Sequence, residues 1–209
     1  MGVYEVEGVA PNGGNPVPDA VLGFFTANGN GTATAINDQN SGGTITQHQV
    51  SQGTYSVASN GRVTLSGFTG TPPILYLVNT NQAFVVGQDS SVASGILEPQ
   101  TAVPPYTNLS ILGNYLGATT TPVQSAIVDA VSFLFADGNG NINGIQNFSG
   151  PSGTGTLDLS ATYEVDSTGR AVMTGAPAGI LYVVSAKKIV LLPTGNAPAL
   201  SSFNLGLTN

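Results

Sequence analysis

Two halves of the chain carry the same short sequences in the same order. The repeated blocks are residues 2–4 with 113–115, 24–31 with 133–140, 55–62 with 163–170, and 74–78 with 180–184. The offset between the copies is nearly constant, which indicates duplication of a whole folding unit. A chain of 209 residues built in this way has two units of roughly 100 residues, each large enough to bury a core.

The pattern within each unit is typical of short β-strands. Apolar residues occupy every second position from Leu157 to Val165, and a period of two predicts a strand with one buried face. Residues 28–31 and 137–140 are rich in Asn, Asp and Gly, which accept the positive φ of tight hairpin turns. We therefore predict an all-β chain of two tandem antiparallel units, each with about eight short strands folded as a small barrel or sandwich.

Two hairpins are apolar at successive positions instead of alternating. They pair residues 74–78 with 83–86 in the first unit and residues 180–184 with 189–192 in the second. Continuous apolar strands are typical of sheets covered on both faces. We expect both hairpins to be covered in this way.

The boundary between the units is marked by prolines. Pro99, Pro104 and Pro105 make a stiff connection, because proline fixes φ and lacks an amide donor. We place the first unit at residues 1–103 and the second at 104–209. The copies diverge after Val184, as expected if their last strands face different neighbours.

The charge of the chain restricts its partners. The formal net charge is −7, with 4 cationic side chains in all, so the counterion release that drives nucleic-acid binding is missing. We expect neither nucleic acid nor an anionic membrane as a partner. No stretch approaches the roughly 18 continuous apolar residues of a membrane helix, so we expect no membrane insertion. Cysteine is absent, which excludes disulfides and thiolate chemistry.

One turn has the beginning of a calcium loop. Asp137, Asn139 and Asn141 place oxygen side chains at alternate positions, as a hard cation requires. Ile142 stands where a calcium loop has glycine, and the distal bidentate Glu is absent. Turn formation is the alternative explanation, and we favour it.

The two arginines of the chain occupy matching positions. Arg62 and Arg170 each follow a turn glycine, and a repeated guanidinium could clamp a carboxylate or phosphate. The alternative, which we favour, is that each arginine holds a carboxylate or carbonyl of the protein itself.

Aromatic residues and acids give weak signals for other sites. The matched tyrosines are Tyr4 with Tyr115, Tyr55 with Tyr163, and Tyr76 with Tyr182. They could form a sugar-stacking platform, but at alternating strand positions aromatics more often fill a core. His48 is the sole histidine, so a repeated His-centred triad is excluded. A glycosidase pair is formally open among Glu5, Glu7, Glu98 and Glu164, but nothing in their spacing suggests convergence. We expect no enzyme activity, catalytic residue or cofactor.

The order of the repeated motifs resembles that of known repeat modules. Each unit has Gly-x-Tyr, Phe-x-x-x-Asp/Asn-Gly-Asn-Gly, Gly/Ala-Thr-Tyr-x-Val-x-x-x-Gly-Arg and Ile-Leu-Tyr-x-Val. This order resembles tandem β-repeat modules in predicted secreted and cell-surface proteins of soil bacteria. The resemblance implies export and modularity, with a location outside the bacterial cell or on its surface, and it carries over no functional residue.

These observations favour a noncatalytic extracellular structural or adhesive protein, whose partner is another copy or the cell surface. Assembly into a filament could use strand addition, which supplies main-chain hydrogen bonds whatever the side-chain charge. The candidate strand begins the chain and contains Val3, Tyr4, Val6 and Val9. The alternative is a ligand-binding module, in which a barrel encloses a small apolar molecule or a glycan.

Overall fold

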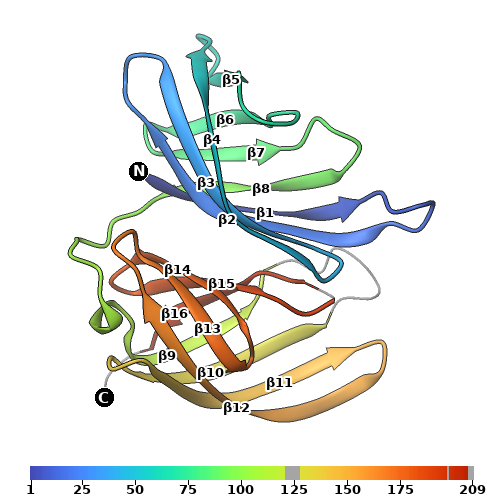
Figure 1. Cartoon of the computed structure of the whole chain (residues 1–209), viewed down its shortest axis with the longest axis vertical. Helices are drawn as coiled ribbons and strands as arrows, with labels where there is room; N and C mark the ends of the chain where they lie inside the picture. Colours follow the sequence, from blue (N-terminus) through green and yellow to red (C-terminus); the bar gives the residue numbers. More distant parts are fainter. Residues whose placement is uncertain (121–127, 197, 207–209) are drawn as a thin grey trace.

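The computed structural model describes residues 1–120, 128–196 and 198–206, which form two closed antiparallel β-barrels of eight strands each (Figure 1). The prediction of two tandem all-β units of about eight strands is confirmed, and each unit is a barrel. No helix among the described residues is long and apolar enough to cross a membrane.

The strands follow one another around each barrel in sequence order. The first barrel comprises β1 (Gly2–Ala10), β2 (Val17–Ala27), β3 (Thr32–Ser41), β4 (Thr44–Val57), β5 (Arg62–Ser66), β6 (Ile74–Asn79), β7 (Gln82–Val86) and β8 (Val92–Pro99). The second comprises β9 (Leu112–Thr119), β10 (Asp129–Asp137), β11 (Asn141–Gly150), β12 (Gly153–Val165), β13 (Arg170–Ala176), β14 (Gly179–Ser185), β15 (Lys188–Pro193) and β16 (Ser201–Leu205). A short 3-10 helix, η1 (Asn108–Ser110), precedes β9.

Closure of the first barrel occupies both edges of β1. Along this strand, Val3 lies opposite Phe24 of β2 on one side and opposite Glu98 of β8 on the other. The strand that we expected to be available for donation, with Val3, Tyr4, Val6 and Val9, is therefore paired on both sides within its own chain. Donating it would require opening the barrel and breaking two rows of main-chain hydrogen bonds.

Pairing also corrects one of the repeat matches. Val3 lies opposite Phe24, whereas Leu116, not Asn114, lies opposite the matching Phe133. The structural counterpart of Tyr4 is therefore Gly117, two residues beyond Tyr115. The register of a strand is set by its neighbours, which a three-residue sequence match does not include.

Side chains fill the second barrel. Its inward-facing residues form one buried cluster that includes Tyr115, Leu134, Tyr163, Met173 and Phe203. The Tyr163 hydroxyl donates hydrogen bonds to the carbonyls of Asn108, at 3.0 Å, and Ile111, at 2.6 Å. The segment around η1 is thereby tied to the interior core.

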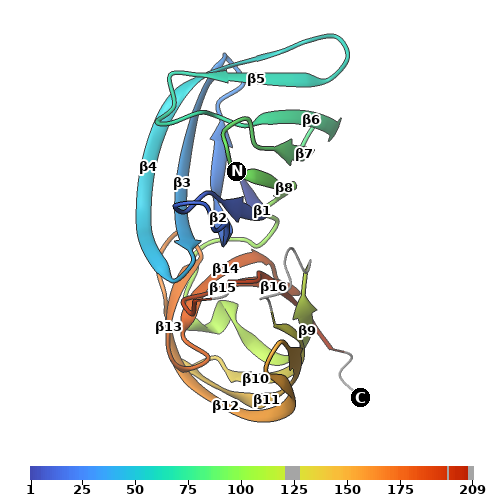
Figure 2. The same cartoon turned by 90° about the vertical axis from the view of Figure 1, so that its right-hand side faces the viewer.

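The barrels pack side by side through two apolar outer faces. The first barrel contributes the β1–β2 face, made of Val3, Leu22 and Phe24. The second contributes the β14–β15 face, made of Ile180, Tyr182, Val190 and Leu192. The Phe24 and Tyr182 rings have centroids 4.6 Å apart. Figures 1 and 2 show β14 and β15 directly beneath β1 and β2.

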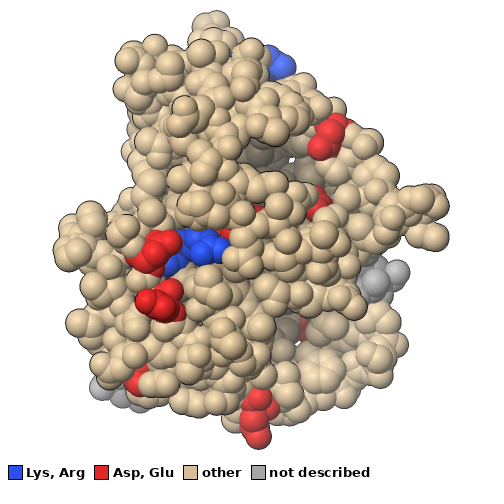
Figure 3. All heavy atoms as spheres, in the orientation of Figure 1, with Lys and Arg blue, Asp and Glu red and all other residues tan. Residues whose placement is uncertain are grey.

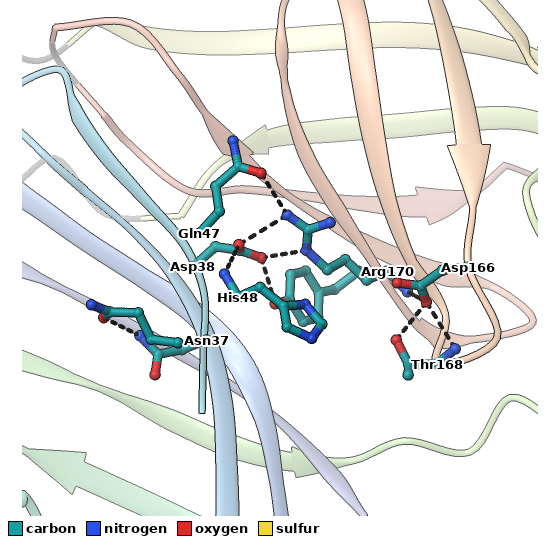
Figure 4. A network of polar contacts seen from close by, with 9 residues as sticks. Asn37, Asp38, Gln47, His48, Asp166, Thr168 and Arg170 are labelled. Carbon is teal, nitrogen blue, oxygen red and sulfur yellow. Dashed lines mark hydrogen bonds and ion pairs between the residues drawn. The ribbon is translucent and has the colours of Figure 1, made fainter. Parts of the chain in front are cut away.

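A buried ion pair joins the barrels beside this apolar contact. Asp38 of β3 is fully buried and accepts two hydrogen bonds from Arg170 of β13, at 2.7 and 2.9 Å (Figure 4). The same carboxylate accepts hydrogen bonds from the Tyr182 hydroxyl, at 2.7 Å, and from the His48 amide, at 2.9 Å. Its oxygens are thus well satisfied, as a buried charge requires.

A second charged cluster lies at the same junction. Lys188 of β15 donates hydrogen bonds to Glu5, at 3.1 Å, and to Glu98. Glu7 accepts hydrogen bonds from the Leu200 amide and the Thr120 hydroxyl. On the face shown in Figure 3, charged side chains are sparse and basic atoms gather where the barrels meet. Glu5, Glu7 and Glu98 of the first barrel thus all have partners in the second half of the chain.

Burial differs between the two continuously apolar hairpins. The β14–β15 hairpin is buried on both faces, as predicted. In the β6–β7 hairpin the inward Leu75, Ala83 and Val85 are buried, but the outward Tyr76 and Phe84 are exposed. The prediction is therefore wrong for the first unit, where the described residues leave the outer face uncovered.

The two arginines should differ in their effect on stability. Replacing Arg170 with Met leaves Asp38 buried without its cation, which should lower the free energy of unfolding by about 3–5 kcal/mol. Arg62 is partly exposed and donates a hydrogen bond to Thr64 at 2.7 Å, so Arg62→Met should cost less than about 1 kcal/mol. Urea unfolding of the two variants tests this difference, and equal losses would contradict the assigned role of the ion pair.

Stability should fall as pH rises through the weakly acidic range. Burial, and then the neighbouring Glu98 carboxyl, raise the pKa of Glu5 from 4.5 to about 7 against the opposing charge of Lys188. The folded state therefore binds this proton more tightly than the unfolded state. The proton on Glu5 stabilises the folded state fully below pH 4.5, and this stabilisation is lost as pH approaches 7. The free energy of unfolding should fall by at most about 3 kcal/mol over this range.

The variant Glu5→Gln should reduce this dependence on pH. Chemical denaturation at several pH values between 4.5 and 7 measures the slope for both proteins. A slope that is unchanged in Glu5→Gln would show that another group causes it.

Candidate functional site

The interior of the first barrel contains a cavity of about 560 Å³. Its size is within the range of small-molecule sites. The apolar part of its wall comes from several strands and from the loop between β5 and β6, and includes Val6, Val21, Phe25, Leu65, Phe68, Leu75, Val85 and Leu97.

Several residues of the cavity wall are smaller than their counterparts in the second barrel. Strand pairing makes Val85 and Leu97 the counterparts of the larger Leu191 and Phe203. Ser51 similarly replaces Leu159. Because the interior of a closed eight-strand barrel is only just filled by side chains, these smaller residues leave room.

Tyr4 and Phe25 of the opposite wall are larger than their counterparts. The counterparts are Gly117 and Leu134. The Tyr4 ring lies against Gly23, where a Cβ would come within 2.7 Å of the ring atom Cζ. Glycine at this position therefore allows an aromatic surface to form part of the wall, and burial raises the pKa of the Tyr4 phenol.

Acidic and amide side chains occupy one part of the wall. Asp19 is buried and accepts a hydrogen bond of 2.8 Å from Gln39. Burial raises the pKa of Asp19, and the charge of Asp89 raises it further. Asp89 also lines the cavity and accepts a 3.0 Å hydrogen bond from the Ser91 amide. The described lining residues include no Lys, Arg or His, so a bound anion would meet acids without a compensating cation.

The predicted calcium residues form a hydrogen-bonded turn. The Asp137 carboxylate accepts hydrogen bonds from the amides of Asn139, at 2.8 Å, and Asn141, at 2.9 Å, and from the Asn141 side chain, at 2.6 Å. These bonds lower the pKa of Asp137. Asn28 accepts the same two backbone bonds in the first barrel. In the part of the chain that the structure describes, no group of three or more His, Asp or Glu residues is placed to hold a metal.

The matched arginines have different partners. Arg170 clamps a carboxylate bidentately, but the carboxylate is Asp38 of the other barrel. Arg62 donates a hydrogen bond to Thr64 of its own strand. The structure does not bring the two guanidinium groups to one site.

The tyrosines occupy four different environments. Tyr115 and Tyr163 fill the second barrel, where burial raises the pKa of Tyr163 to about 12. Tyr55 packs against the core of the first barrel. Tyr182 lies between the barrels, and Tyr76 lies on the outer surface.

The glutamates named as a formal catalytic pair lie outside the cavity. Glu5 and Glu98 share Lys188, and Glu7 accepts hydrogen bonds near Leu200. Glu164 is exposed on β12. The carboxylates that line the cavity are Asp19 and Asp89, which alternation alone did not single out.

No family model matches this sequence, and no curated protein matches it. The cavity therefore provides the strongest physical indication of a function.

Substitutions that copy one barrel into the other should test the cause of the cavity. Val85→Leu adds a buried methylene to an unfilled space and should raise the free energy of unfolding by about 0.8 kcal/mol. The reverse change in the second barrel, Leu191→Val, should lower it by about 1 kcal/mol, since it opens a space in a filled core. Denaturant titrations measure both, and destabilisation by Val85→Leu would mean that the first interior is already full.

Proposed function

We propose that this chain is a noncatalytic extracellular β protein whose first barrel binds a small, largely apolar molecule. The supporting observation is the cavity of about 560 Å³ with an apolar and aromatic wall. A ligand gains free energy there by removing its apolar surface from water.

The polar part of the wall restricts the ligand further. Asp19 and Gln39 offer oxygen acceptors, which suit a hydroxyl, amine or amide N–H donor. Because the described lining residues carry no cationic group, burial of an anion would be costly. The proposed ligand class is therefore a neutral or cationic molecule with an apolar body and at least one hydrogen-bond donor.

A matched pair of fluorescent probes tests this proposal. N-phenyl-1-naphthylamine is neutral and carries an N–H donor, and 8-anilino-1-naphthalenesulfonate has the same body with an added sulfonate. The neutral probe should bind one site per chain, and the sulfonate should bind at least about tenfold more weakly.

Two variants show whether the probe occupies the cavity. Leu97→Phe enlarges a side chain of the cavity wall opposite Tyr4 and should weaken binding of the neutral probe. Asp19→Asn removes a carboxylate from the wall and should reduce the difference in affinity between the neutral probe and the sulfonate. Phe84→Ser, on the outside of the same barrel, is the control and should leave binding unchanged. Loss of binding in Phe84→Ser alone, or equal binding of both probes, would contradict the proposal.

A structural or adhesive role is a second candidate function. The observation that favours it is the exposure of large apolar residues on the outer faces of both barrels, among them Tyr76, Phe84, Val131, Phe133 and Phe135. Exposed apolar surface of this kind commonly marks an interaction site.

A further inference from the structure

Each half of the contact between the barrels has an uncovered counterpart in the other barrel. The counterpart of the β14–β15 face is the β6–β7 face of the first barrel, made of Ile74, Tyr76, Phe84 and Val86. The counterpart of the β1–β2 face is the β9–β10 face of the second barrel, made of Leu116, Val131 and Phe133. The duplication has thus produced two copies of each face, and one copy of each takes part in the contact between the barrels.

Strand pairing establishes this equivalence. Tyr76 lies between Arg62 and Phe84 across the sheet, as Tyr182 lies between Arg170 and Val190. Phe133 lies between Leu116 and Ile145, as Phe24 lies between Val3 and Ile36. Corresponding residues therefore occupy corresponding places on the two barrels.

The aromatic pair at the centre of the internal contact shows the difference in exposure. Phe24 and Tyr182 pack together and are 3% and 0% exposed. Their counterparts Phe133 and Tyr76 are 43% and 44% exposed. Both residue types are kept in both copies, although in the described part of the chain only one of each is covered.

We propose that the β9–β10 face of one copy of this chain packs on the β6–β7 face of the next, repeating the internal contact between barrels. The occupant of each uncovered face is then a second copy of the chain, and Phe133 of one copy lies against Tyr76 of the next. Because the two faces differ, the contact is head to tail and leaves one of each face free at the ends of any open assembly. Such a contact gives a ring if the rotation closes and a filament if it does not. This contact would make a second copy of the chain the partner in the structural role proposed above. It does not depend on the cavity.

Arg62 retains the charge of Arg170, but other charges of the internal contact are missing from the proposed one. Asp38 lies opposite Leu22, and its counterpart Asn147 lies opposite Val131. The counterpart of Lys188 is Gln82, and the counterpart of Glu5 is Ala118. Arg62 of the next copy would therefore meet a neutral amide where Arg170 meets a carboxylate. The association between copies should be weaker than the internal contact and depend on protein concentration.

Sedimentation velocity of the full chain over a range of concentrations tests the proposal. The weight-average mass of the unmodified chain should rise with concentration. Phe133→Ser and Tyr76→Ser each destroy one face, and each variant alone should remain monomeric. Both residues are exposed, so circular dichroism and the unfolding midpoint should show that the barrels remain folded.

A mixture of the two variants distinguishes head-to-tail packing from other arrangements. Phe133→Ser retains an intact β6–β7 face and Tyr76→Ser retains an intact β9–β10 face. Their mixture should form a one-to-one dimer that does not grow, since each partner then has only a damaged face left. Association of either variant by itself, or no dimer in the mixture, would overturn the proposal.

A gain of affinity provides an independent test. Asn147→Asp supplies the carboxylate of the internal contact to Arg62 of the next copy and should tighten association at least about tenfold. Asn143→Asp adds the same charge at another exposed position of β11 and should not tighten it. An unmodified chain that stays monomeric at every concentration, together with an Asn147→Asp variant that also stays monomeric, would refute the proposal.

Binding of N-phenyl-1-naphthylamine, measured on the same variants, separates this inference from the proposed ligand site. The probe should bind Phe133→Ser and Tyr76→Ser as it binds the unmodified chain. Loss of association with retained probe binding in Phe133→Ser or Tyr76→Ser would show that the two properties are independent. Loss of probe binding with retained association in Leu97→Phe would show the same.

Discussion

Closure of each eight-strand sheet limits both the space inside a barrel and the ways in which it can contact other molecules. A closed sheet has no unpaired edge strand, so its main-chain groups are already hydrogen-bonded. The interior then has a nearly fixed volume, and side-chain size decides whether it is full or hollow. Leu159, Leu191 and Phe203 fill the second barrel, and smaller residues at the same places leave the first partly empty.

The contact between the barrels shows how duplicated units acquire different roles. Its apolar centre, Phe24 against Tyr182, uses residue types that both copies retain. Its charged residues Asp38, Glu5 and Lys188 are each replaced by uncharged residues at the equivalent positions. An apolar centre is thus shared by all four faces, while these three charged residues occur only in the two faces that meet within the chain.

Much of the fold followed from the sequence because it depends on local patterns. The period-two alternation before Val165 and the Asn- and Gly-rich turns predicted the strands and hairpins, and the repeated blocks predicted two units. Pairing over long distances was not accessible. Asp38 and Arg170 meet only because two barrels pack together, and the counterpart of Tyr4 depends on which residues of β2 and β8 lie beside it.

The candidate site was less predictable than the fold. A cavity depends on the summed volumes of inward residues from many strands, and no single residue signals it. Asp19 was not singled out because a carboxylate on a strand usually faces solvent. The uncovered β6–β7 face was missed for a similar reason, since a continuous apolar run predicts burial without saying what covers it.

The alternation of side chains along β7 has a consequence for how this protein can change. Val85 points into the first barrel, and its neighbours Phe84 and Val86 point outward. A mutation at Val85 alters the space inside the barrel, and a mutation at Phe84 or Val86 alters the surface that the barrel presents. The interior and the outer surface can therefore evolve separately, although both are encoded in the same five-residue strand.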